Sequence, residues 1–268
     1  MIKYGFIGAG NMGGALARAL RSRVEGSEIL INDKDVEKAE KLAVDISGKQ
    51  GDVHVLASSC RYIFIAVKPQ VLPVMFDEIK GDLAARRDRF VLVSMAAGVT
   101  VASIKEYAGG DYPVIRIMPS LPASVGQGMI LYTADDGVFE NEIEEFVSDM
   151  SCAGIFDRIP EKLIDAGSAV SGCGPAFVYM FAEAMADGGV ACGLPRDKAL
   201  TYAYQTLAGA ASLLKLSDKH PGKLKDEVCS PGGSTIQGVL ELERSAFRSA
   251  VSDAVIASYE KTVELGKK

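Results

Sequence analysis

Histidine and cysteine, which supply many of the ligands in metal centres, are scarce in this sequence. Its 268 residues include two histidines, His54 and His220, and five cysteines. No two cysteines form a C-x-x-C pair, so a zinc site would have to be assembled from residues scattered along the chain. We therefore expect no metal site. The unpaired thiols indicate a reducing compartment.

Long apolar runs and basic stripes are also missing. No stretch reaches the roughly 18 uncharged apolar residues that a membrane-spanning helix requires, and the first residues show no signal-peptide pattern. The net charge of −6, without a stripe of lysine and arginine, argues against nucleic-acid binding. The 48% apolar and 24% charged residues are typical of a globular protein. These features predict a soluble cytoplasmic protein with neither a membrane nor a nucleic-acid partner.

The first part of the chain alternates between short apolar runs and helical spacing. Helical spacing covers residues 12–20, 36–46 and 139–150. Apolar runs without polar alternation suit strands buried on both faces of a parallel sheet. Such runs occur at residues 4–7, 29–31, 62–67, 90–93 and 114–118, and we expect further edge strands at 129–132 and 155–158. Strand and helix in turn predict a doubly wound α/β domain over residues 1–160.

After about residue 160 the strand-like runs end and alanine-rich helical spacing takes over. One helix face carries Leu200, Ala203, Tyr204, Leu207, Ala211 and Leu214, and another carries Val251, Val255, Tyr259 and Val263. These broad faces, rich in small residues, exceed what a domain of this size needs to cover itself. We therefore predict an all-helical domain over residues 161–268 that packs between subunits, giving a homo-oligomer that is at least a dimer.

A glycine-rich turn follows the first strand. Its residues match the pattern G-x-G-x-x-G and are Gly8, Ala9, Gly10, Asn11, Met12 and Gly13. The first glycine makes the tight turn, the second lets backbone approach a pyrophosphate, and the third allows close packing of helix on strand. The helix that opens here offers free N–H groups to the phosphates. The motif and its context predict a dinucleotide cofactor.

The end of the second strand reads Asn32-Asp33-Lys34. Asp33 lies where an acid would bind the adenosine ribose hydroxyls of NAD. Asn32 and Lys34 could instead meet the 2′-phosphate of NADP. A third interpretation is that Asp33 or Asp35 only caps the following helix. The choice between NADH and NADPH stays open at this point.

Two further loops follow strands at the same edge of the sheet, beside the expected cofactor crevice. The first holds Ala66, Val67, Lys68 and Pro69. Pro69 keeps Lys68 out of helical geometry, so the lysine can lie over phosphate or ribose, or it is a solvated loop residue. The second loop holds Met95, Ala96 and Ala97, small or slender residues where backbone could lie close to a nicotinamide ring.

The helical half contains two glycine-rich segments. Residues 171–176 lead into a helix, and Cys173 within them has no neighbouring histidine, which favours a packing role over a nucleophile. Residues 230–235 open another helix with two glycines and several hydroxyls. The N–H groups there could hold a carboxylate or phosphate. The alternative is that Ser234 or Thr235 caps the helix.

Together these segments resemble the pyrroline-5-carboxylate reductase family, and the resemblance covers essentially the whole chain. The most specific stretch is residues 224–235, which looks like the family signature. The other similar stretches are residues 66–70, 96–99, 171–176, 186–190 and 193–196.

The resemblance implies a Rossmann-type N-terminal domain, a helical dimerisation domain, and an active site between them. It implies hydride transfer from NADPH or NADH to the C=N carbon of 1-pyrroline-5-carboxylate, which gives L-proline in the last step of proline biosynthesis. Gly233 and Ser234 would then bind the substrate carboxylate through backbone N–H groups. Thr235 would hydrogen-bond the ring nitrogen as the catalytic residue, and Glu161 matches a position near the substrate amine. Imine reduction of this kind needs no metal.

The sequence departs from the family pattern in two places. Ser120 stands where the family usually has asparagine, which puts a side-chain contact there in doubt. Residues 54–61 look shorter than usual, as if a helix were trimmed. A family asparagine that touches the adenosine end of the cofactor has no clear counterpart here, and Ser58 is a weak candidate.

Two other functions are compatible with a dinucleotide-binding turn. A β-hydroxyacid dehydrogenase would need a lysine where Val178 stands and an asparagine where Ala182 stands, so this class is disfavoured. A regulatory protein that senses NAD(P)H without turnover would not need the glycine-rich turn at residues 230–235, so this turn could have degenerated in it. Residues 230–235 are intact, which favours an enzyme.

Overall fold

The computed structural model describes residues 2–266, which divide into two compact units. The sheet unit comprises the residues up to Cys173 together with those from Ser258 onward, and the helical unit spans Gly174–Ala257. This division falls later than the boundary expected near residue 160, because α7 (Glu161–Ser171) packs on a strand of the sheet.

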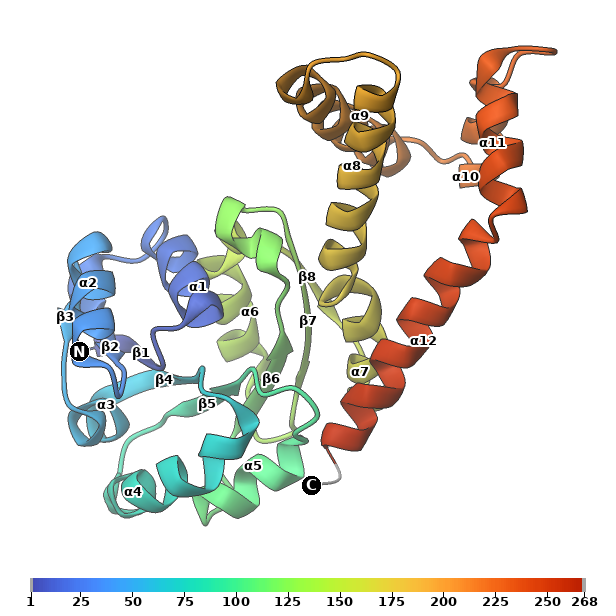
Figure 1. Cartoon of the computed structure of the whole chain (residues 1–268). Helices are drawn as coiled ribbons and strands as arrows, with labels where there is room; N and C mark the ends of the chain where they lie inside the picture. Colours follow the sequence, from blue (N-terminus) through green and yellow to red (C-terminus); the bar gives the residue numbers. More distant parts are fainter. Residues whose placement is uncertain (1, 267–268) are drawn as a thin grey trace. The chain divides into compact units, whose positions relative to one another are not determined.

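The described part of the sheet unit contains one eight-stranded sheet (Figure 1). Its spatial order is β3-β2-β1-β4-β5-β6-β7-β8. The strands are β1 (Ile2–Ile7), β2 (Ile29–Asn32), β3 (Lys49–Gln50), β4 (Cys60–Ile65), β5 (Val91–Ser94), β6 (Val114–Met118), β7 (Gly128–Ala134) and β8 (Gly154–Arg158). All neighbours pair in parallel except β6 and β7. The predicted doubly wound α/β fold is confirmed, with strands at every predicted apolar run.

Two features of the sheet lie outside the sequence prediction. β3 is a pair of exposed polar residues and carries no apolar signal. β7 runs antiparallel to β6 because only the short 3₁₀ turn η3 (Leu121–Val125) connects them, and a parallel return needs a longer crossover.

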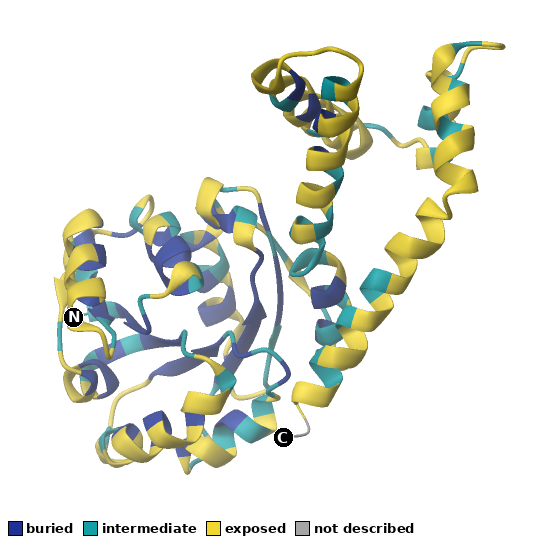
Figure 2. Ribbon diagram, viewed as in Figure 1, coloured by how far each residue is buried: buried dark blue, intermediate teal, exposed yellow. Residues whose placement is uncertain are grey.

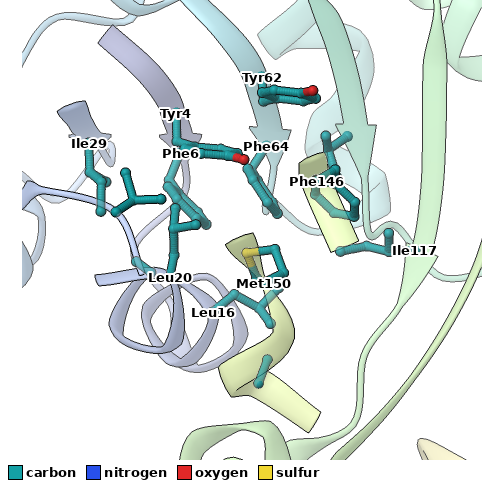
Figure 3. Close-up of a cluster of buried hydrophobic side chains, with 14 of the residues drawn as sticks. Tyr4, Phe6, Leu16, Leu20, Ile29, Tyr62, Phe64, Ile117, Phe146 and Met150 are labelled. Carbon is teal, nitrogen blue, oxygen red and sulfur yellow. The ribbon is translucent and has the colours of Figure 1, made fainter. Parts of the chain in front are cut away.

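Helices cover both faces of the sheet. They are α1 (Asn11–Arg21), α2 (Val36–Asp45), α3 (Val53–Ser59), α4 (Leu72–Ala85), α5 (Val101–Ala108) and α6 (Glu140–Asp149). On one face α1, α2 and α6 enclose a core in which Tyr4 stacks on Tyr62 and Phe6 on Phe64, with ring centroids 5.1 and 4.2 Å apart (Figure 3). On the other face α3, α4 and α5 pack over Ile63, Ile65 and Leu92. The central strands β4, β5 and β6 are therefore buried on both faces, as their uninterrupted apolar runs predict.

The helical unit has little core of its own. It contains α8 (Gly174–Ala191), α9 (Arg196–Leu216), α10 (Pro221–Glu227), α11 (Ser234–Arg244) and most of α12 (Phe247–Leu265). The buried side chains described there are those of four alanines: Ala182, Ala186, Ala199 and Ala203. Most of its surface is exposed in the single chain (Figure 2). A unit with so little buried apolar area needs a partner to cover it.

Candidate functional site

A cavity of about 610 Å³ opens at the carboxyl ends of β1, β2 and β4. It lies in the sheet unit, where open α/β sheets bind their ligands. The predicted cofactor residues that line it are Gly8, Gly10, Asn32, Asp33, Lys34, Ala66, Val67 and Lys68. Ala9, Asn11, Met12, Gly13 and Pro69 belong to the same two turns without lining the cavity. The structure thus brings three separated segments of the sequence together.

The glycine-rich turn has the geometry that its motif predicts. Gly8 has φ of 115°, a conformation that side chains rarely adopt. A Cβ on Gly13 would collide with the carbonyl oxygen of Gly8, whereas a Cβ on Gly10 would meet no heavy atom within 4 Å. Gly10 is also the N-cap of α1 and offers no side-chain acceptor to the first turn. The N–H groups there face open space suited to a pyrophosphate.

Asp33 is bound to the glycine-rich turn. Its Oδ2 accepts a hydrogen bond of 2.6 Å from the backbone N–H of Ala9, and its Oδ1 accepts one of 2.9 Å from that of Asp35. The cap of α2 is Asp35 instead, which accepts from the N–H of Lys38. Hydrogen bonding to Lys38 lowers the pKa of the Asp35 carboxyl. Of the two acids, then, Asp35 serves the helix and Asp33 faces the cavity.

The other residues predicted at this end of the sheet have identifiable local roles. The Asn32 side-chain amide donates to the carbonyl of Gly51 at 3.0 Å, so it holds the chain after β3. Lys68 is exposed at the end of β4 in extended geometry, just before the turn that Pro69 opens. Lys68 lines the cavity, and its contact with phosphate or ribose stays a prediction.

Burial, a hydrogen bond and close backbone packing hold the loop after β5 in place. Within this loop, Ala96 is buried, and Met95 and Ala97 are half-buried. The Ala96 N–H donates to Ser94 Oγ at 3.4 Å. Gly98, at φ of 73°, lies so close to the end of α12 that a Cβ would meet the Gly266 nitrogen at 2.9 Å. This loop follows the strand next to β4, but its residues do not line the cavity.

Several cavity residues carry no motif in the sequence. They come from α3, α4 and the turns before them: Asp52, Val53, Val71, Val74, Met75 and Glu78. Asp52 caps α3 by accepting from the N–H of His54, a signal that sequence reasoning could have used. Glu78 lies mid-helix, and only the tertiary fold brings it to the cavity.

The segment expected to be short, residues 54–61, forms the two-turn helix α3 and the start of β4. The His54 ring lies 2.7 Å from Asp82 on α4, and this hydrogen bond raises the pKa of the imidazole. Ser58 bonds to the carbonyl of His54 and does not line the cavity. The weak candidacy of Ser58 as a cofactor ligand gains no support from this position.

Glu161 takes part in a partly buried charge network at the start of α7. Its Oε1 accepts from the N–H of Val101, the first residue of α5, at 2.7 Å and lies 3.3 Å from the Arg116 guanidinium. Arg116 is 1% exposed, and its other terminal nitrogen donates to Asp165 at 2.6 Å. Its Nε is a buried donor for which the described residues supply no acceptor. Glu161 therefore stabilises α5 and neutralises Arg116, roles that the sequence did not indicate.

The Ser120 side chain also makes a hydrogen bond within the sheet unit. It is buried, and its hydroxyl accepts from the N–H of Met129 at 2.9 Å. The side chain that departs from the family pattern thus connects the turn after β6 to β7.

The second glycine-rich turn lies in the helical unit at the start of α11. Gly232 has φ of 71°, and Gly233 is the N-cap, with no side-chain hydrogen bond to the first turn. Ser234 and Thr235 are exposed, and neither of them caps the helix. The Gly233 N–H donates to the Ser230 carbonyl at 3.0 Å, so the N–H groups open to a ligand are those of the first turn after Gly233. Together with the two exposed hydroxyls, they form an arrangement that can hold a carboxylate.

The described residues supply no group of three or more His, Cys, Asp or Glu side chains that could hold a metal ion. Nor is any helix among them both long enough and apolar enough to cross a membrane.

Family models match both parts of the chain. Residues 161–265 match the pyrroline-5-carboxylate reductase dimerisation family, and residues 3–98 match the coenzyme F420-dependent NADP oxidoreductase family. The first match begins at the domain boundary that the sequence predicts, although the compact units divide later. That boundary therefore stays a prediction.

Known proteins are similar over the full length. The chain is 39% identical to pyrroline-5-carboxylate reductase 3 of Danio rerio, with all of this chain and 92% of the relative covered. It is also 39% identical to pyrroline-5-carboxylate reductase of Synechocystis, with 100% and 99% covered. The crystal structure of Plasmodium falciparum pyrroline carboxylate reductase with NADP bound matches with a TM-score of 0.87 at 31% identity, with 99% and 98% covered.

Proposed function

The chain belongs to the pyrroline-5-carboxylate reductase family, and we propose that its cavity and its second glycine-rich turn carry out that family's reaction. It is an NAD(P)H-dependent oxidoreductase that reduces 1-pyrroline-5-carboxylate to L-proline, the last step of proline biosynthesis. The single observation that carries the site assignment is the cavity over the glycine-rich turn, which Gly10 leaves open and which Asp33 lines.

The cofactor, when bound, supplies a hydride to the imine carbon, and the chain holds it in place. We assign its pyrophosphate to the turn from Gly8 to Gly13 and its adenosine ribose to Asn32, Asp33 and Lys34. Lys68, in the loop that starts at Ala66, offers a positive charge to the phosphates from the facing rim. Met95, Ala96 and Ala97 are assigned to the nicotinamide ring.

The substrate is assigned to the start of α11. We assign its carboxylate to the N–H groups of Gly233 and Ser234, aided by the positive end of the helix. The Gly233 N–H donates to the Ser230 carbonyl at 3.0 Å and would be shared between that carbonyl and the carboxylate. The substrate reacts as the protonated imine: hydride adds to the ring carbon, the electron pair of the C=N bond moves onto the ring nitrogen, and the nitrogen keeps its proton and becomes the amine. The Thr235 hydroxyl is assigned to hydrogen-bond this nitrogen. Two contacts on one rigid ring fix its orientation, and such positioning can supply much of the acceleration.

Glu161 is proposed to lie near the substrate amine. The Glu161 carboxylate already accepts hydrogen bonds from Val101 and Arg116 through Oε1. A contact with the substrate would therefore use the acceptor positions that these two bonds leave free. Any contact with the substrate would therefore depend on the network that holds Glu161 in place.

The chain forms a homo-oligomer through its helical domain, and we propose at least a dimer built on residues 161–268. We also propose a cytoplasmic location without nucleic-acid or membrane partners. All five cysteines are free in the structure, and burial raises the pKa of the Cys60 thiol to about 12. Unpaired thiols of this kind fit a reducing compartment.

The test is oxidation of NADH and NADPH by the purified chain with 1-pyrroline-5-carboxylate, with proline measured as product. We expect turnover that depends on the cyclic imine. A small β-hydroxyacid with NAD(P)⁺ serves as the comparison, because Val178 and Ala182 supply no acid or base for an alcohol-oxidising site. Tight NAD(P)H binding without turnover on either substrate would instead indicate a sensor protein.

A further inference from the structure

We propose that the cavity selects NADH over NADPH, with Asp33 as the residue that determines this preference. The inference rests on the proposed function for the placement of the cofactor. It goes further by assigning the adenosine end of the cavity to a ribose with a free 2′-hydroxyl.

The Asp33 carboxylate is fixed in a position to accept from a ribose. Backbone donors at Ala9 and Asp35, at 2.6 and 2.9 Å, hold one oxygen each. A carboxylate has about four acceptor positions, so each oxygen can still accept from a hydroxyl. A 2′-hydroxyl has a proton to donate. A 2′-phosphate carries a charge of about −1.5 to −2 at neutral pH and would lie against a like charge that the backbone prevents from moving away.

The other charged side chains of the cavity also favour NADH over NADPH. Three carboxylates line it (Asp33, Asp52 and Glu78) against two ammonium groups (Lys34 and Lys68), which leaves an excess of one negative charge. Lys68 stands at the end of β4, which leaves Lys34 as the other ammonium group that lines the cavity. Lys38 also lies near Asp33, but its ammonium group is paired with Asp35 at 3.0 Å.

Among the described residues no arginine lines the cavity, although an arginine is the usual partner of a 2′-phosphate. Arg18, on the helix that follows the glycine-rich turn, is already paired with Asp45 at 2.5 Å. The described residues at the adenosine end thus include a fixed carboxylate and no guanidinium group. This composition suits a ribose 2′-hydroxyl, which donates a hydrogen bond.

The test uses the full-length enzyme and compares NADH with NADPH by fluorescence titration and by kcat/KM with 1-pyrroline-5-carboxylate. We expect wild type to favour NADH by about tenfold or more, equivalent to about 1.4 kcal/mol. Asp33→Asn removes the charge and keeps an acceptor oxygen for one of the two backbone donors, so it should improve NADPH relative to NADH by about tenfold or more. Asp35→Asn is the matched control, because Asp35 caps α2 outside the cavity lining, and it should leave the ratio unchanged.

Equal or tighter binding of NADPH by wild type would overturn the proposal, as would an unchanged cofactor ratio in Asp33→Asn. Its melting temperature shows whether Asp33→Asn folds. If it does not fold, Glu78→Gln also removes one negative charge from the cavity and should likewise improve NADPH relative to NADH. Failure of the proposed function has a different result: no turnover with either cofactor, while the binding preference for NADH persists.

Discussion

At the residue scale, Gly10 and Gly13 differ in whether the fold itself requires a glycine. A Cβ at this position would meet nothing within 4 Å, so the fold itself does not require glycine there. At Gly13 the opposite holds, because a Cβ would collide with the Gly8 carbonyl. The fold thus requires a glycine at position 13, whereas the glycine at position 10 leaves room for the proposed cofactor.

We predict that Gly10→Ala abolishes most NAD(P)H binding with little change in melting temperature, because the added methyl occupies space needed by the pyrophosphate. Fluorescence titration beside thermal unfolding measures both quantities. Gly13→Ala is the comparison and should lower stability. Wild-type cofactor binding by Gly10→Ala would show that the cofactor has been placed wrongly.

Thr235 carries the proposed contact with the substrate nitrogen. Its side chain is exposed in the first turn of α11, and Gly233 rather than Thr235 is the helix cap. The hydroxyl is therefore not needed to start the helix.

We predict that Thr235→Ala lowers kcat/KM by about tenfold to a hundredfold, because one positioned hydrogen bond is worth roughly 1–3 kcal/mol in a desolvated site. The melting temperature should stay close to that of wild type. Thr235→Ser, which restores the hydroxyl, should recover most of the activity. A fall in stability of about 1 kcal/mol with unchanged kcat/KM would instead identify Thr235 as a structural residue.

The sequence could predict those site residues that belong to local motifs. Gly8, Gly10 and Asp33 follow from the spacing of one strand-turn-helix unit, and the structure brings them to one cavity. Glu78 could not be found in this way, since it lies on α4 and reaches the cavity only after α4 packs on the sheet. The sequence also could not show that Asp35 rather than Asp33 caps α2, because the cap depends on the backbone geometry at the start of this helix.

At the element scale, the start of α7 is connected to β6 and α5 by charge. Arg116 on β6 lies between Glu161 and Asp165 of α7, and Glu161 also accepts from the first N–H of α5. No acidic residue of α5 itself lies in its first turn, so Glu161 supplies the negative charge that favours a helix start.

We predict that Glu161→Ala lowers stability by about 1–3 kcal/mol, because it removes an acceptor from Val101 and leaves Arg116 with one carboxylate. Glu161→Gln keeps an acceptor for Val101 and should cost less. Melting temperature and the KM for substrate, measured together, separate this structural role from the proposed contact with the substrate. A raised KM in Glu161→Ala with an unchanged melting temperature would contradict the structural role.

Most elements of the sheet unit were predictable because their strands are buried on both faces and their helices have one apolar face. The exceptions have physical reasons. β3 is short and polar, and its pairing with β2 is set by the chain that returns from α2. The direction of β7 follows from the length of its connection rather than from any property of its own residues.

At the scale of the whole molecule, the helical unit determines the oligomeric state. Four buried alanines are its described core, while Met180 and Leu216 are 69% and 88% exposed in the single chain. The family match for these helices is a dimerisation domain. An obligate interface typically buries upwards of about 2,000 Å², enough to replace the missing core.

We predict that Met180→Asp disrupts the oligomer and lowers both melting temperature and activity, because it buries a charge in an apolar interface. Val44→Asp is the matched control, since Val44 is 81% exposed on α2 of the sheet unit. Light scattering at micromolar concentration measures the mass. A fully active wild-type monomer of 28.4 kDa would contradict this assignment.

Deuterium transfer from the cofactor to proline is the most direct measurement of the reaction assigned to this chain. The purified enzyme is supplied with 1-pyrroline-5-carboxylate and with NADH or NADPH fully deuterated at C4 of the nicotinamide, and the product is examined by NMR and mass spectrometry. The expected result is one deuterium at C5 of L-proline for each cofactor oxidised, and none at Cα. Proline without deuterium, or cofactor oxidation without proline, would contradict hydride transfer to the imine carbon.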